Sequence, residues 1–164
     1  MSTDTTILDH QMAYMKMAVD LSEQALLSGH GGPFGAIIVR DREVIGSSGN
    51  CVFQNTDPTS HAEIMAIRDA CNNIQSQDLS GCSIYSSAEP CPMCMAAIYW
   101  ARIEAVFFSN TEHDSLKYGF IDTVILDELR KDPADRAIQS TRILHPHAIE
   151  VFRKAREMGV AKTV

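Results

Sequence analysis

A chain of 164 residues with 45% apolar content is long enough to bury the core of one domain, and we predict a single domain over residues 1–164. Its formal net charge of −7, with no basic cluster denser than residues 153–156, disfavours binding to the polyanionic backbone of nucleic acid. No apolar run is long enough to span a bilayer, so we expect no membrane association, and the five cysteines fit a reducing cytoplasm better than a disulfide framework.

The start of the chain is predicted to form a helix followed by a β-hairpin. Apolar residues recur near helical spacing over about residues 7–28, which indicates an amphipathic helix. Glycine and proline at 29–33 end this helix. Two short apolar runs, at 36–39 and 44–46, then flank a charged turn at 41–42, which is typical of a hairpin.

Helix-like and strand-like segments alternate in the rest of the chain. In order, they are a turn at 55–58, a helix from His61, a strand at 82–85, a helix from Cys91 through Ala101, a strand at 105–108, a weaker strand at 142–144 and a helix at 146–158. The hairpin makes one strand pair antiparallel, and the helical crossovers make later pairs parallel. We therefore predict an α/β fold, a three-layer α/β/α sandwich around a mixed five-stranded sheet.

Two segments carry the residues with metal chemistry: His61-Ala62-Glu63 and Pro90-Cys91-Pro92-Met93-Cys94. Imidazole and thiolate are the ligands that zinc prefers, and three protein ligands leave a fourth position open for water. Water bound to zinc supports hydrolysis near neutral pH. We therefore predict one Zn²⁺ per chain, held by His61, Cys91 and Cys94. His-x-Glu followed by Pro-Cys-x-x-Cys is the signature of zinc deaminases.

Each part of this pattern also has a structural interpretation. A Cys-x-x-Cys pair occurs in redox centres and in four-cysteine zinc sites, but no second pair exists here to complete a closed site. Ser60 and Glu63 have the spacing of a capping box, with Ser60 as N-cap and Glu63 at the third helical position. Beside a zinc site, we interpret Glu63 instead as the proton carrier.

The spacing also predicts where the site lies. Residues two apart on a helix point about 200° apart, so His61 and Glu63 can converge only beyond the helix N-terminus. Cys91 and Cys94 likewise open a segment that begins Cys-Pro, which is typical of a first helical turn. We therefore predict one site between two helix N-termini, where the helix dipoles favour thiolates.

Four runs of sequence resemble the cytidine deaminase superfamily, and within it they are most similar to the small bacterial guanine deaminases. These runs are Gly31–Ala36, Asp57–Glu63, Ser87–Cys94 and Ala97–Arg102. The likeness extends from about residue 12 to about residue 125 and more weakly to the end. It implies that the chain hydrolyses guanine to xanthine and ammonia. In that reaction Glu63 takes a proton from the attacking water and returns it to the ring nitrogen.

The resemblance also implies the substrate contacts. It places Asn50 in the pocket, where its amide can both donate and accept toward a base edge. It makes Phe34 and Trp100 walls around the flat ring, and the backbone of Ala62 a hydrogen-bonding partner of the base. From the residues alone, the alternative is that Asn50 after Gly49 turns the chain after a strand and that both aromatics belong to the core.

The second proton carrier is implied at Asp122. In guanine deaminases a carboxylate after a Gly-Phe pair assists proton transfer to the leaving amine, and Gly119-Phe120-Ile121-Asp122 matches that position. The alignment needs a one-residue gap, so Glu112 and Asp114 stay open as alternatives. A solvated loop carboxylate is the structural interpretation.

One departure and several rivals remain. Related guanine deaminases end with an aromatic residue that closes the pocket, in some cases that of a partner subunit, whereas this chain ends in Val164. We expect a homodimer, in which the helix at 146–158 packs on its own sheet or on a partner's. The rivals are a tRNA adenosine deaminase, which the net charge disfavours, a deaminase of guanosine or another amino-substituted purine, pyrimidine or triazine, and a non-catalytic zinc-stabilised relative.

Overall fold

The structure is a computed structural model that describes residues 2–120 and 123–160, with side chains from residue 8 onward. The chain divides into two compact units, one up to Ile121 and one from Asp122. The first unit contains every described strand and the whole zinc motif.

The first unit is built on a mixed sheet with the strand order β2-β1-β3-β4. The strands are β1 (Gly35–Arg40), β2 (Glu43–Gly49), β3 (Ser83–Ala88) and β4 (Ala105–Asn110). β1 pairs antiparallel with both β2 and β3, and β3 pairs parallel with β4. The expected hairpin is confirmed. Its turn residues, Asp41 and Arg42, both have positive φ (51° and 68°), which matches the twist of the flanking strands.

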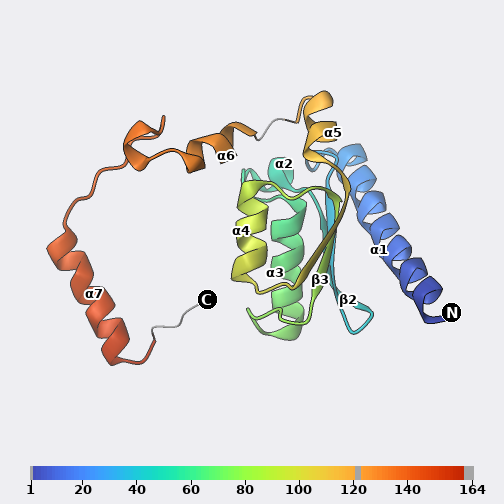
Figure 1. Cartoon of the computed structure of the whole chain (residues 1–164), viewed down its shortest axis with the longest axis horizontal. Coiled ribbons are helices and arrows are strands. Elements are labelled where there is room, and N and C mark those ends of the chain that lie inside the picture. Colours follow the sequence, from blue (N-terminus) through green and yellow to red (C-terminus); the bar gives the residue numbers. More distant parts are fainter. Residues whose placement is uncertain (1, 121–122, 161–164) are drawn as a thin grey trace. The chain divides into compact units, whose positions relative to one another are not determined.

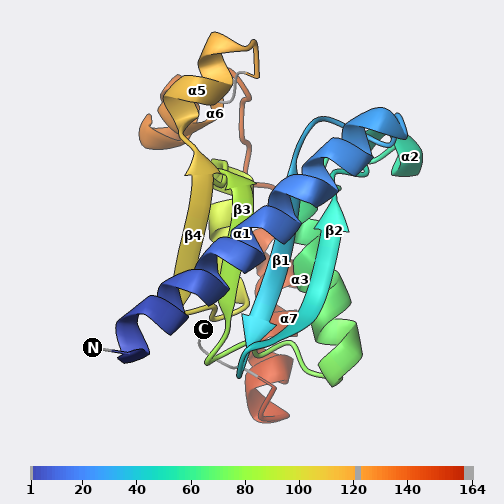
Figure 2. The ribbon, with the colours of Figure 1, turned by 90° about the vertical axis from the view of Figure 1, so that its right-hand side faces the viewer.

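Helices cover both faces of this sheet, which confirms the three-layer α/β/α sandwich. α1 (Ser2–Leu27) crosses one face, and α3 (Ala62–Ile74) and α4 (Pro92–Trp100) cover the other (Figures 1 and 2). Two short helices complete the unit, α2 (Val52–Asn55) and α5 (Glu112–Lys117). The α1 face packs Ala18 against Ile37, Val39 and Tyr85.

Small residues bring α3 close to the hairpin. Ala62, Ala66 and Ala70 repeat every fourth position, and all three are fully buried against the sheet. Gly46 on β2 faces this stripe, and a Cβ there would lie 2.5 Å from the Ala66 carbonyl oxygen. The contact therefore requires glycine at 46, and it fixes α3 with its N-terminus at one end of the sheet.

The second unit contains α6 (Thr123–Arg130), a 3₁₀ turn at Pro133–Asp135 and α7 (His145–Glu157). The predicted C-terminal helix is thus confirmed to within one residue. The predicted fifth strand at 142–144 is wrong, and the sheet of the described residues has four strands. Leu144 is the N-cap of α7 in the left-handed conformation (φ 54°) and Pro146 follows, so this segment enters a helix instead of a sheet.

No helix among the described residues is long and apolar enough to cross a membrane.

Candidate active site

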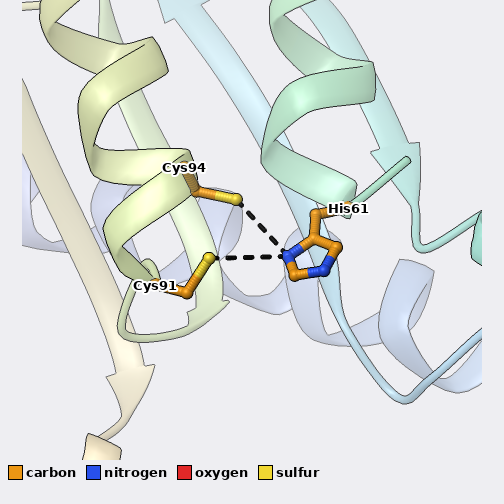
Figure 3. Close-up of side chains that lie close together, drawn as sticks. All are labelled: His61, Cys91 and Cys94. Carbon is orange, nitrogen blue, oxygen red and sulfur yellow. Dashed lines mark hydrogen bonds between the residues drawn. The ribbon is translucent and has the colours of Figure 1, made fainter. Parts of the chain in front are cut away.

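His61, Cys91 and Cys94 come together between the starts of two helices. His61 is the N-cap of α3 and Cys91 is the N-cap of α4. The Nδ1 atom of His61 lies 3.6 Å from the sulfur of Cys91 and 3.6 Å from that of Cys94 (Figure 3). The geometry expected from the spacing, one site between two helix N-termini, is therefore present.

These three side chains fit a zinc ion. Their ligand atoms all lie within 4.8 Å of one another, and one imidazole with two thiolates is a donor set that zinc prefers. A hydrogen bond with Cys94 lowers the pKa of Cys91 to about 4. The same bond, together with burial, raises the pKa of Cys94. Without metal the pair therefore keeps one proton, which zinc must displace, and zinc binding depends on pH.

Glu63 lies in the second helical position of α3 and is only 6% exposed. The capping-box interpretation is wrong, because the N-cap is His61 and makes no side-chain cap. Ser60 lies one residue before the cap, and its hydroxyl donates instead to Asp57 (2.9 Å).

The carboxyl of Glu63 is buried between β3 and the cysteine helix. The hydroxyl of Ser86, itself 1% exposed, donates to its Oε1 at 3.3 Å. Burial is the main cause that raises the pKa of Glu63, and the nearby Cys91 raises it further. A carboxyl with a raised pKa exchanges a proton more readily near neutral pH. The sequence did not predict the role of Ser86. The one feature that points to it is a polar residue at the position between Ile84 and Ala88, on the face of β3 that packs against α3.

Asn50 is buried, and its orientation is fixed by the backbone. Its Oδ1 accepts from the N–H of Gly32 (3.3 Å) and from that of Val52 (3.2 Å). Both acceptor positions of this oxygen are thus used, and among the described residues Nδ2 is left as a donor. Asn50 can therefore only donate to a ligand, whereas the sequence suggested both donation and acceptance. Gly31 permits this arrangement, because a Cβ there would lie 2.0 Å from Oδ1.

The other expected substrate contacts lie at different places. Ala62 is the first residue of α3, so its N–H has no acceptor within the helix. Phe34 precedes β1 and packs edge-to-face against Phe120, with ring centroids 5.2 Å apart. Trp100 ends α4 and is 71% exposed. With nine residues at 1.5 Å each, it lies about 13 Å along the helix from Cys91, so within the described chain it does not line the zinc end.

The three acids proposed for the second proton transfer are Asp122, Asp114 and Glu112. Asp122 lies outside the described residues. Asp114 is half-buried and forms a capping box with Thr111 at the start of α5, and hydrogen bonds from Thr111 lower its pKa. A carboxylate held ionised in a cap is a poor proton carrier near neutral pH. Glu112 is exposed, at the first position of α5.

A sequence profile of the cytidine and deoxycytidylate deaminase zinc-binding region matches residues 8–110. The chain belongs to this family. Members of the family are zinc-dependent hydrolytic deaminases, and His61, Cys91 and Cys94 are the residues that this chain offers to the zinc.

Individual relatives extend the comparison. The guanine deaminase of Bacillus subtilis is 39% identical over 155 residues, which is 94% of this chain and 99% of that protein. Its crystal structure superposes with a TM-score of 0.88 and covers 93% of this chain and 97% of that one. A tRNA-specific adenosine deaminase from Aquifex aeolicus is 40% identical over 117 residues, 70% of this chain and 75% of that one. A guanine deaminase from Nitrosomonas europaea is 25% identical, with a TM-score of 0.63 over 87% of this chain and 82% of that one.

Proposed function

We propose that this chain hydrolyses guanine to xanthine and ammonia. The observation that carries this proposal is the extent of the match to the Bacillus subtilis guanine deaminase, which covers 94% of the chain. The match therefore continues well beyond the zinc-binding region at residues 8–110. The match to the tRNA-specific adenosine deaminase of Aquifex aeolicus is shorter and covers 70% of the chain.

The proposed chemistry assigns the proton transfers to Glu63. When bound by His61, Cys91 and Cys94, zinc would supply a Lewis acid that lowers the pKa of a water molecule. The Glu63 carboxylate accepts a proton from the attacking water and returns it to the ring nitrogen beside the amino-bearing carbon. Its burial and raised pKa support this role, because both protonation states are then accessible during one turnover. The hydroxyl of Ser86 holds one carboxyl oxygen in place.

Asn50 provides the proposed selection among bases. Its Nδ2 donates, so it pairs with a carbonyl or ring-nitrogen acceptor and not with an amino group. Guanine presents acceptors at both O6 and N7, whereas adenine keeps only the N7 acceptor and presents an amino group at the position of O6. The Ala62 N–H adds a second donor at the start of α3, and the ring of Phe34 packs on the base. We propose that Trp100 contacts the base bound in the site of a second copy of the chain.

We propose Asp122 as the carboxylate that assists the leaving amine. The alternatives lose support from their surroundings: Asp114 is engaged in the cap of α5, and Glu112 is exposed at the start of the same helix.

A tRNA adenosine deaminase is the second candidate, favoured by the 40% identity to the Aquifex aeolicus enzyme. An anticodon arm requires a cationic surface, because phosphate contacts supply most of its affinity. The net charge of −7 makes such a surface a poor fit.

We further propose that the protein is a homodimer and that it is cytoplasmic. Its five cysteines form no disulfide, which suits a reducing compartment.

The test is ammonia release by the zinc-loaded chain from guanine, guanosine, adenine, cytosine, cytidine and an anticodon stem-loop. We expect turnover of guanine and none of cytidine or the RNA. Turnover of a different amino-substituted ring without guanine would retain the deaminase and discard guanine. Turnover of the stem-loop would favour the tRNA enzyme.

A further inference from the structure

The turn that leads into α3 is held by one carboxylate, that of Asp57. Its Oδ1 accepts from the backbone N–H of Thr59 at 2.8 Å and from the Thr59 hydroxyl at 2.7 Å. Its Oδ2 accepts from the Ser60 hydroxyl at 2.9 Å, with Arg68 at 3.9 Å. The bonds from Thr59 lower the pKa of Asp57, so the group stays an ionised acceptor.

Ser60 connects this turn to the loop at Asn50 and Cys51 through hydrogen bonds. It is fully buried, and its hydroxyl accepts from the amide of Asn55 at 3.1 Å while it donates to Asp57. Its carbonyl oxygen accepts from the N–H of Cys51 at 2.9 Å. Cys51 directly follows Asn50, so the same residue joins the loop of the substrate amide to the turn before His61.

His61 follows this fixed turn directly. Its own N–H donates to the carbonyl oxygen of Thr59 at 2.8 Å, inside the turn that Asp57 closes. The backbone that carries the imidazole is therefore hydrogen-bonded in the turn before it, and its carbonyl oxygen accepts from the N–H of Met65 in α3 at 3.0 Å. Neither of the cysteine ligands contributes to this arrangement, since Cys91 is the N-cap of α4 and Cys94 lies in the first turn of that helix.

We propose that Asp57 is a positioning residue for zinc: it fixes the backbone of His61, through Ser60, so that Nδ1 faces the two sulfurs before the metal arrives. A preformed ligand loses less conformational freedom when it binds, so zinc is held more tightly. The proposal rests on the zinc site of the proposed function and does not depend on guanine being the substrate.

The chain contains a matched control for the local motif. Asp78 accepts from the N–H of Ser80 at 3.0 Å and from its hydroxyl at 2.6 Å, and it pairs with Arg102 at 3.1 Å. This turn has the same kind of bonds as the turn at Asp57, but no zinc ligand follows it. A purely structural loss should therefore be similar at Asp57 and at Asp78.

The experiment measures the dissociation constant of Zn²⁺ by competition with a chelating indicator, together with the melting temperature of each metal-free full-length chain. We expect Asp57→Ala to weaken zinc binding about tenfold, the lower end for groups that support a metal ligand. Asp78→Ala should leave the zinc dissociation constant within about twofold of the wild-type value. It should lower the melting temperature by about as much as Asp57→Ala does. Equal zinc affinity in wild type and Asp57→Ala, or equal losses in both variants, would overturn the proposal.

Two further variants test the route through Ser60. Asp57→Asn retains an acceptor for Thr59 but offers none to the Ser60 hydroxyl, so we expect about a threefold weaker zinc affinity, and this variant carries the test if Asp57→Ala does not fold. Ser60→Ala should weaken zinc binding, and adding Asp57→Asn to it should weaken it little further, because the two changes remove the same bond. Additive losses would contradict the route. If wild type binds zinc but leaves guanine intact, the guanine assignment fails while this comparison stands.

Discussion

At the scale of single residues, the buried carboxyl of Glu63 is the group on which the proposed chemistry depends. In the proposed reaction Glu63 acts first as a base and then as an acid. A glutamine side chain has nearly the same size and shape as glutamate, but it can do neither. We expect Glu63→Gln to keep zinc and fold and to lower kcat by about a hundredfold or more. Zinc content, circular dichroism and ammonia release measure the three quantities. A variant with normal kcat per folded molecule and a lower melting temperature would show that Glu63 serves only the helix.

The orientation of the Asn50 amide depends on Gly31, which has no side chain. A Cβ at Gly31 would lie 2.0 Å from Asn50 Oδ1 and 2.6 Å from the Asn50 carbonyl oxygen, so the amide must move. We therefore expect Gly31→Ala to raise KM for guanine about tenfold, the loss of roughly one good hydrogen bond, with zinc content unchanged.

Gly32→Ala is the graded control for this change. Its Cβ would meet only the ring of Phe34, at 3.1 Å, and that side chain can shift. We expect a smaller rise in KM. Equal KM values for Gly31→Ala and wild type would mean that the orientation of Asn50 does not select the substrate.

At the scale of elements, the N-terminal ends of α3 and α4 carry the three predicted zinc ligands. Cys91 is the N-cap of α4 and Cys94 lies in its first turn, so a metal ion bound to them and to His61 would link the two helices. We expect Cys94→Ala to lose zinc and to lower the melting temperature to that of the wild-type chain treated with a chelator. Cys71→Ala, which removes a free cysteine away from the ligands, should keep its zinc. Full zinc occupancy in Cys94→Ala would exclude Cys94 as a ligand.

The sequence predicted these elements where the pattern is local. The 3.6-residue period, the Cys-Pro start and the charged hairpin turn each leave a mark within a few residues, and the sheet, its helices and the zinc ligands follow from them. The orientation of Asn50 and the hydroxyl of Ser86 depend on backbone groups that are far away in sequence, and no local pattern reports them. The strand expected at 142–144 failed because three apolar and basic residues carry little information, while Leu144 and Pro146 start a helix.

At the scale of the whole molecule, the second unit cannot be stable by itself. None of the side chains described in residues 123–160 is buried, and Ile138, Ile143 and Phe152 are 83%, 80% and 74% exposed. A segment of roughly 40 residues rarely buries enough apolar surface to fold alone. The apolar side chains of this unit therefore need a larger surface, either that of their own first unit or that of a second copy.

The homodimer prediction follows from α7. Ile149, Phe152 and Ala155 recur at helical spacing on one side of this helix, and Lys154 lies on the opposite side. If the stripe packs on a partner subunit, Phe152→Asp places a charge in the interface and should shift the chain from dimer toward monomer by at least about tenfold in dissociation constant. Lys154→Asp introduces the same residue on the exposed side and should leave the dimer intact. Sedimentation of both variants across micromolar concentrations measures this difference. If wild type sediments as a compact 18.1 kDa monomer, the homodimer prediction is wrong.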